Sequence, residues 1–221
     1  MSRLKVSSQE RIYSELRKRI MSGFYSPGTK LREEHIASEM SVSRTPVRAA
    51  IQRLVKDGLV KNEENKGAEI IGLTDRDLGE IFDLRMLLEP YVASVAAEQA
   101  TEQEIKALEM LNEDMFKAIR SEKSDFVMLV QQLNNQFHHL LCQAAHSGRL
   151  TTLVERYLDI PVIIGSFYFY SQDDMLKSYH AHKEIVEALK HRNSMYAETA
   201  MRLHLTASRS LFSRHRSSVT S

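Results

Sequence analysis

The chain has 221 residues and a formal net charge of +1, and it is long enough to bury a core as one large domain or two modest ones. Its single cysteine, Cys142, excludes an internal disulfide, and its most apolar window, residues 160–165, is far too short to span a bilayer. No signal peptide is apparent after Met1. We therefore expect a protein of the reducing cytoplasm with no membrane partner.

The charge is distributed unevenly along the chain. Residues 1–72 hold 14 Lys and Arg against 9 Asp and Glu, a net charge of +5, whereas residues 73–221 have a net charge of −4. A basic N-terminal part joined to an acidic C-terminal part is typical of a DNA-binding domain coupled to a second domain.

Three helices are predicted in the first part of the chain. The first covers Gln9–Ser22, with Ile12, Leu16 and Ile20 at helical spacing. The second is short, residues 31–40, and a tight turn at residues 41–43 leads into a third helix that ends at Gly58. Two helices joined by such a turn predict a helix–turn–helix.

The third helix has two chemically different faces. Ser43 or Thr45 is suited to cap its start, and Pro46 suits its first turn. One face is apolar and spaced for burial, with Val47, Ala50, Ile51 and Leu54. The other face carries Arg44, Thr45, Arg48 and Gln52, whose groups read base edges or grip phosphate. The alternative interpretation of this polar face is an ordinary solvated helix surface.

Two short strands follow, at residues 59–63 and 68–71, and Asn65-Lys66-Gly67 between them is a hairpin signal. With the three helices they predict a winged helix–turn–helix. From about Gln9 to Leu73 the sequence resembles the GntR family of bacterial transcription regulators, through VSRTPVR at residues 42–48 and QRLVKDGLV at residues 52–60.

The resemblance implies a set of DNA-contacting residues. Arg44, Thr45 and Arg48 match the reading positions, and Lys66 and Gly67 match the wing tip that enters the minor groove. The complete predicted set is Arg32, Ser43, Arg44, Thr45, Arg48, Gln52, Lys66 and Gly67. The sequence departs from the family pattern at Ser41, where a turn glycine is usual, and at Ala49, where glutamate is usual.

The rest of the chain shows only helical periodicity. The predicted helices are Asp75–Gln99, Glu102–Glu122, Asp125–Ala145, Leu150–Tyr170 (bent or broken near Pro161), Asp173–Lys190 and Ser194–Ser213. We therefore predict a mainly α protein, with a winged helix–turn–helix domain at residues 1–72 and an antiparallel helical bundle at residues 73–221. The polar ends, Met1–Ser8 and Ser213–Ser221, are expected to be loose.

Three histidines fall on helix faces that should be apolar: His138, His182 and His204. His182 lies eleven positions before residue 193 and His204 eleven after it, so an antiparallel helix pair that turns there places both at the same height. Asn134 precedes His138 by one turn on the same face. Each histidine alone is more often a buried residue satisfied by neighbours, but three converging imidazoles and an amide oxygen suit a divalent transition metal: zinc, with nickel or copper as alternatives.

The C-terminal part, about Asp75–Ser213, resembles the helical effector domain of the FadR subfamily, through LRMLLEPYVASVAA, NNQFHHLL, HKEIVEAL and MRLHL. The resemblance implies that Asn134, His138, His182 and His204 bind the metal, with asparagine in place of the usual aspartate. It also implies a small carboxylate effector, for which Arg85 supplies the counter-charge. The alternative for Arg85 is an ion pair with Glu89 one turn further along the helix.

These features predict a homodimeric, ligand-responsive transcription regulator, a repressor by analogy with the family, that binds a palindromic operator in double-stranded DNA. One alternative is a metal-dependent enzyme with a DNA-binding appendage. The lack of an acidic general base on the stripes that carry the histidines argues against it. The other alternative is a metal sensor, in which the ion itself is the signal.

Overall fold

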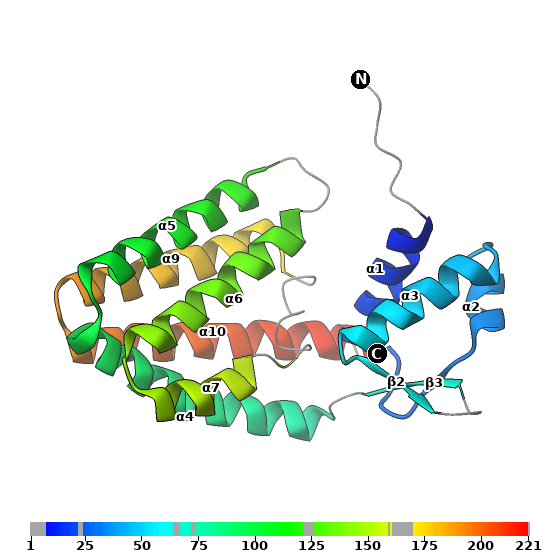
Figure 1. Ribbon diagram of the computed structural model, residues 1–221, viewed down its shortest axis with the longest axis horizontal. Coiled ribbons are helices and arrows are strands. Elements are labelled where there is room, and N and C mark those ends of the chain that lie inside the picture. Colours follow the sequence, from blue (N-terminus) through cyan, green and yellow to red (C-terminus); the bar gives the residue numbers. More distant parts are fainter. Residues whose placement is uncertain are drawn as a thin grey trace. The chain divides into compact units, whose positions relative to one another are not determined.

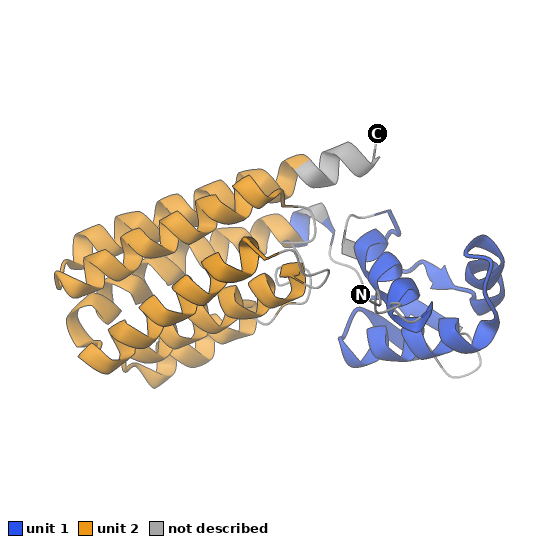
Figure 2. Cartoon of the chain, turned by 90° about the horizontal axis from the view of Figure 1, so that it is seen from above, with its two compact units in different colours: residues 1–77, 216–221 blue, residues 78–215 orange. Residues whose placement is uncertain are grey.

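The computed structural model describes residues 8–21, 24–63, 67–71, 74–121, 126–158, 160 and 170–220. The chain forms two compact units, residues 1–77 with 216–221 and residues 78–215 (Figure 2). The domain border that we predicted between residues 72 and 73 falls outside the described residues. The fold is mainly α, as predicted, and no described helix has both the length and the hydropathy needed to cross a membrane.

The described residues of the N-terminal unit up to Ile70 form three helices and a small sheet. The helices are α1 (Ser8–Met21), α2 (Glu33–Glu39) and α3 (Arg44–Lys56), and the strands are β1 (Lys30–Leu31), β2 (Val60–Glu63) and β3 (Gly67–Ile70). The sheet order is β1-β3-β2 with antiparallel neighbours, Leu31 opposite Ala68 and Val60 opposite Ile70. A helix–turn–helix followed by a β-hairpin confirms the predicted winged arrangement.

Burial explains why α3 forms and where it ends. Its apolar face lies inside the unit, with Val47, Ala50, Ile51 and Leu54 at most 3% exposed. Gly58, at φ 69°, follows the helix, and the amide of Leu59 donates to the carbonyl of Leu54 at 3.0 Å, so the last turn is closed as predicted. At the other end Ser43 occupies the N-cap position, but its side chain makes no capping hydrogen bond. Ser43 therefore occupies the predicted cap position but does not stabilise the helix start through its side chain.

Two features of this unit differ from prediction. β1 was not predicted, because a two-residue strand carries too little alternation to be recognised and exists only through its pairing with β3. It also makes the second helix begin at Glu33 rather than at residue 31. Residues 64–66, between β2 and β3, lie outside the described residues, and they include the predicted DNA contact Lys66.

In the described part of the C-terminal unit every regular element is a helix. The elements are α4 (Asp75–Gln99), α5 (Glu102–Ile119), α6 (Phe126–Ala144), α7 (Gly148–Leu158), α9 (Gln172–Lys190) and α10 (Ser194–Thr220). Figure 1 shows the longer helices running lengthwise beside one another. Reciprocal capping boxes start two of them: Thr101 with Glu104 begins α5, and Ser171 with Asp174 begins α9. Together these helices confirm the predicted bundle.

The largest differences in helix boundaries are at two places. α10 continues to Thr220, so the polar C-terminal residues that we expected to be loose are helical, because polar residues such as serine and arginine are tolerated on an exposed helix. α7 ends at Leu158, and residues 161–169, which the prediction placed in the same helix, lie outside the described residues.

A proline inside α4 creates a link to α10. Pro90 has no amide hydrogen, so it cannot donate to the carbonyl of Met86 four residues earlier. That carbonyl instead accepts a hydrogen bond from Nη1 of Arg202 on α10 at 3.3 Å. A second link joins Arg209 to Asp83, at 2.5 Å between Nη1 and Oδ1. These two links hold α4 and α10 together, and both helices contribute residues to the buried polar site described below.

Candidate functional site

The three predicted histidines meet in the middle of the bundle. His138 comes from α6, His182 from α9 and His204 from α10, and each is at most 5% exposed. The ring centroids lie 5.2 Å apart for His138 and His182, 5.3 Å for His138 and His204, and 4.8 Å for His182 and His204. We call these three residues the imidazole cluster.

The cluster can supply one ligand nitrogen from each ring. The nearest such nitrogens all lie within 4.8 Å of one another. Three nitrogens bound tetrahedrally to one zinc ion lie about 3.4 Å apart, given a Zn–N bond of about 2.0–2.1 Å. The rings would therefore need only a small inward movement to share one cation.

His182 is the least satisfied member of the cluster. Its ring stacks on Phe137 at 4.0 Å and an interplanar angle of 1°, and neither of its nitrogens has a hydrogen-bond partner among the described residues. Complete burial and the neighbouring His204 and His138 hold its pKa well below the ordinary value. It is thus a neutral imidazole with an available lone pair, the form that binds metals.

His204 has the same character. Burial, together with His138, lowers its pKa to about 3, with Glu89 opposing and Arg85 adding to this shift. The ring is therefore neutral at physiological pH. Two neutral imidazoles at the centre of an apolar core make the cluster chemically suited to a cation.

A buried carboxylate supports the third ring. Glu89 on α4 is 2% exposed, and its Oε2 lies 2.9 Å from Nδ1 of His138. An ionised carboxylate only accepts hydrogen bonds, so His138 donates from Nδ1 and keeps Nε2 as its free nitrogen. The sequence does not predict the contact of Glu89 with His138, because nothing in the spacing of Glu89 relates it to α6.

Arg85 completes this chain of contacts. Its Nε donates to Oε1 of Glu89 within α4, and the side chain is 8% exposed. Burial alone would raise the pKa of Glu89, but the Arg85 guanidinium and the His138 hydrogen bond outweigh burial and hold it at about 2. The ion pair that we weighed as the alternative for Arg85 is therefore present. Glu89 lies on α4, outside the stripes of α6, α9 and α10 that carry the histidines, so it does not alter the expectation that these stripes lack an acidic general base.

Asn134 lies one turn before His138 on α6 and is partly buried. Its Oδ1 is buried and has no hydrogen-bond partner within the described residues. A buried carbonyl oxygen without a donor costs about 1–3 kcal/mol. Its lone pairs are therefore available to a cation or to a donor group of a ligand.

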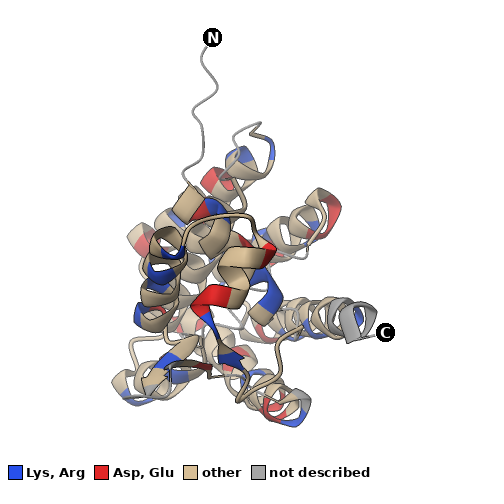
Figure 3. Ribbon diagram, turned by 90° about the vertical axis from the view of Figure 1, so that its right-hand side faces the viewer, with Lys and Arg blue, Asp and Glu red and all other residues tan. Residues whose placement is uncertain are grey.

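The other predicted site lies on α3. Ser43, Arg44, Thr45, Arg48 and Gln52 are all exposed, as is Arg32 before α2. The side chains of Arg44 and Arg48 are 54% and 61% exposed even though both form ion pairs with the first turn of α2. Gly67, the remaining described member of the predicted set, begins β3. Figure 3 shows basic and acidic segments interspersed along the helices.

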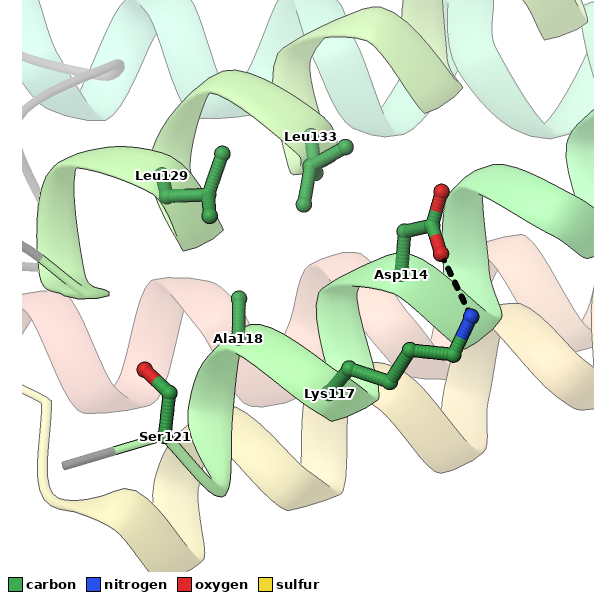
Figure 4. A pocket seen from close by; sticks show the side chains of 6 residues that line it. All are labelled: Asp114, Lys117, Ala118, Ser121, Leu129 and Leu133. Carbon is green, nitrogen blue, oxygen red and sulfur yellow. Dashed lines mark hydrogen bonds and ion pairs between the residues drawn. The ribbon is translucent and has the colours of Figure 1, made fainter. Parts of the chain in front are cut away.

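A surface groove of about 340 Å³ lies elsewhere, between α5 and α6 (Figure 4). Leu129, Leu133 and Ala118 form its apolar walls, and Asp114 and Lys117 form an ion pair of 2.8 Å at its rim. It contains no member of the imidazole cluster. The groove is therefore separate from the polar site in the core.

Two families match the chain. Residues 8–70 match the family described as bacterial regulatory proteins, gntR family, and residues 80–207 match the FCD domain. The HTH-type transcriptional regulator YdhC of Bacillus subtilis is 32% identical over 193 residues, covering 87% of this chain and 85% of YdhC. The HTH-type transcriptional repressor RspR of Escherichia coli is 30% identical over 204 residues, covering 89% of this chain and 85% of RspR.

Further similarities are more limited. The gluconate operon transcriptional repressor of Bacillus subtilis is 40% identical over 121 residues, which cover 55% of this chain and 49% of that protein. The solved structure of E. coli McbR/YncC has a TM-score of 0.63 at 20% identity, covers 95% of this chain and 98% of that one, and shows a shared fold. The matching families and relatives are transcriptional regulators, so the enzyme alternative is set aside.

Proposed function

Because the chain belongs to the GntR family of bacterial transcription regulators, in the FadR-like subfamily that carries an FCD domain, we propose that it is a repressor that reads a palindromic operator with α3 and responds to a small organic acid. Several relatives are named as repressors, which supports repression rather than activation. We assign residues 1–72 to operator binding and residues 73–221 to the effector and dimerisation. Such a regulator acts on the chromosome, so we place it in the cytoplasm.

The observation that carries the DNA-binding proposal is the two-sided packing of α3. Its apolar face is fully buried, while Arg44, Thr45, Arg48 and Gln52 remain exposed near its N-terminal end. Guanidinium forks and amides at the start of a recognition helix match the donors and acceptors of the major groove. Thr45 and Gln52 add hydrogen-bonding groups on the same side. Lys66 and Gly67 remain the proposed contacts of the wing.

Operator binding by an Arg44→Ala, Arg48→Ala double variant tests this proposal. The probe is the duplex that the unmodified protein selects from a randomised library, and the readout is the dissociation constant at fixed salt. We expect a loss of at least a hundredfold, because two bidentate contacts are removed. A matched control is Arg11→Ala, Lys18→Ala, which removes two positive charges from exposed positions of α1. Sequence-specific binding that survives the double substitution in α3 would reject the role of this helix.

We also propose that the imidazole cluster and Asn134 hold a divalent transition metal, zinc first and nickel second. The donor set fits, because two unpaired nitrogens of His182 and the unpaired oxygen of Asn134 face no hydrogen-bond donor among the described residues. Glu89 orients His138 as a carboxylate commonly orients a metal-bound imidazole. When bound, the cation would supply a positive centre that attracts a carboxylate.

For the effector we propose a small carboxylic acid, with Arg85 as its counter-charge. The guanidinium is buried and reaches the cluster through Glu89 and His138. Since Glu89 already engages Nε, an incoming carboxylate must use the remaining donors or compete with Glu89. Gluconate is a reasonable first probe beside other small acids, because one relative is named for the gluconate operon. Thermal stabilisation lost in Arg85→Lys, which keeps the charge but not the planar fork, would support the assignment.

The homodimer is supported by an exposed apolar stripe on α4. Leu84, Leu87 and Tyr91 follow one another at helical spacing and are 37%, 69% and 56% exposed. Large apolar side chains gathered on one helix face favour association, and a palindromic operator requires a two-fold partner, so we propose a second copy of the chain as the occupant. Light scattering after size-exclusion chromatography should give twice the monomer mass, and Leu87→Glu should shift it toward the monomer. A monomeric unmodified protein would contradict this proposal.

A further inference from the structure

The two arginines assigned to DNA reading share one carboxylate. Glu33, in the first turn of α2, accepts two hydrogen bonds from Arg48, one from Nε and one from Nη2, each at 2.9 Å. It also receives Nη2 of Arg44 at 3.5 Å, while Nη1 of Arg44 donates to Glu34 at 2.8 Å. The Glu33 side chain is 25% exposed and lies under arginines that are 54% and 61% exposed. The Glu33 carboxylate therefore holds both guanidinium groups by hydrogen bonds.

The pattern of donors distinguishes the two arginines. Glu33 occupies the side edge of the Arg48 guanidinium, formed by Nε and Nη2. The end edge, formed by Nη1 and the second hydrogen of Nη2, has no partner among the described residues and carries two parallel donors. Two parallel donors match O6 and N7 of guanine in the major groove. The fork of Arg44, in contrast, is divided between Glu33 and Glu34, so neither carboxylate holds it by two hydrogen bonds.

Building on the proposed function of α3, we infer that Glu33 is a specificity-determining positioning residue: it fixes the Arg48 guanidinium so that the free edge presents its donors to one base pair in each half-site. A free arginine side chain loses rotamer entropy when it binds, and a bidentate contact to Glu33 removes much of that loss before DNA arrives. Hydrogen bonding by Arg48 lowers the pKa of Glu33, so the carboxylate is ionised at neutral pH.

The same contact reduces binding to DNA of any sequence. Glu33 and Glu34 balance the charges of Arg44 and Arg48, so this group of four residues is neutral overall. Affinity for phosphate backbone without sequence preference comes from net positive charge. Specificity therefore increases in two ways. The neutral group binds DNA of any sequence more weakly, and the fixed Arg48 guanidinium makes a better contact with its base pair.

Glu33→Gln tests the inference, with Glu34→Gln as the matched control because both residues lie in the first turn of α2 and carry the same charge. The measurement is the ratio of affinities for the selected duplex and for a scrambled duplex of the same composition. We expect Glu33→Gln to lower this ratio by about tenfold, with tighter scrambled binding and weaker selected binding. A repeated library selection should lose preference at the base pair that Arg48→Ala also relaxes. Glu34→Gln should retain that preference.

Glu33→Asp separates position from charge, and it also serves if Glu33→Gln does not fold. The shorter carboxylate keeps the charge but cannot reach both donors of Arg48 in the same way, so base preference should relax while scrambled binding stays unchanged. An unchanged ratio in both variants, or an equal gain for both duplexes, would overturn the inference. If Arg48→Ala itself leaves operator binding intact, the proposed function of α3 fails instead. The two failures are therefore distinguishable.

Discussion

Asn134 contributes a neutral amide oxygen at a position where the subfamily resemblance implies an aspartate. Asn134→Asp should therefore tighten Zn²⁺ binding by about tenfold, equivalent to about 1.4 kcal/mol, because a charged oxygen adds Coulomb attraction to the cation. Competition with a chromophoric zinc chelator measures the change. Gln132→Glu adds the same charge on an exposed position of α6 and should leave the affinity unchanged. Equal affinities of Asn134→Asp and the unmodified protein would remove Asn134 from the ligand set.

Ser41 stands where the family usually has glycine, and its backbone conformation lowers the stability of the turn. Its φ is 53°, in the left-handed region that glycine adopts without penalty, and glycine is the residue that the family usually has in this turn. Ser41→Gly should raise the free energy of unfolding by about 0.5–1 kcal/mol. Urea unfolding followed by circular dichroism measures it. Ser38→Gly, at an exposed position of α2, should instead lower stability by about 0.5 kcal/mol.

Individual residues also mark the limit of prediction from sequence. The meeting of His182 and His204 was predictable because both lie equally far from one turn between two regular helices. The contact of Glu89 with His138 was not, because the two are 49 positions apart and only the packing of α4 against the bundle decides which residue it meets. Likewise, the spacing of α3 predicted exposed arginines, but it did not indicate that Glu33 on α2 would bind them.

At the scale of elements, Pro90 and Arg202 should be energetically coupled. Arg202→Met keeps most of the side-chain length but leaves the Met86 carbonyl without its donor, so it should cost about 0.5–1 kcal/mol of stability. In a Pro90→Ala background the residue at 90 regains an amide that can bond Met86 within α4. The same substitution at 202 should then cost much less, and thermal unfolding of the four proteins in a double-mutant cycle measures the difference. Additive effects would show that the proline and the arginine act independently.

Elements were predicted well where their pattern is long and poorly where it is short. α4 spans Asp75–Gln99 in both prediction and structure, because Thr74 caps its start, with the amide of Asp77 donating to Oγ1 of Thr74 at 3.1 Å. β1 escaped prediction because its two residues become a strand only through pairing with β3. The C-terminal end of α10 was misjudged because polar composition alone does not separate an exposed helix from a loose end.

At the scale of the whole molecule, the metal is expected to contribute to stability. Burial of the imidazole cluster leaves His182 without partners among the described residues, and a cation would satisfy it. Removing the metal with a chelator should therefore lower the melting temperature. Saturation at a hundred times the dissociation constant corresponds to about 2.7 kcal/mol of stabilisation. His182→Ala should show no response to chelator, whereas the surface variant His191→Ala should respond like the unmodified protein. Unmodified protein that melts at the same temperature with and without chelator would contradict the metal assignment.

The same reagents decide whether the ion or the acid is the signal. A ligand shifts an equilibrium between two states only by its difference in affinity for them. A cation enclosed by three helices of one bundle acts mainly on the stability of that bundle, so zinc alone should leave operator affinity within about twofold. A carboxylate that competes with Glu89 for Arg85 loosens the contact between α4 and His138, and the acid should therefore change operator affinity in metal-loaded protein only. Titration of operator binding with zinc, with each acid, and with both together measures these responses. A full change in affinity with zinc alone would make the protein a metal sensor and remove the acid from its mechanism.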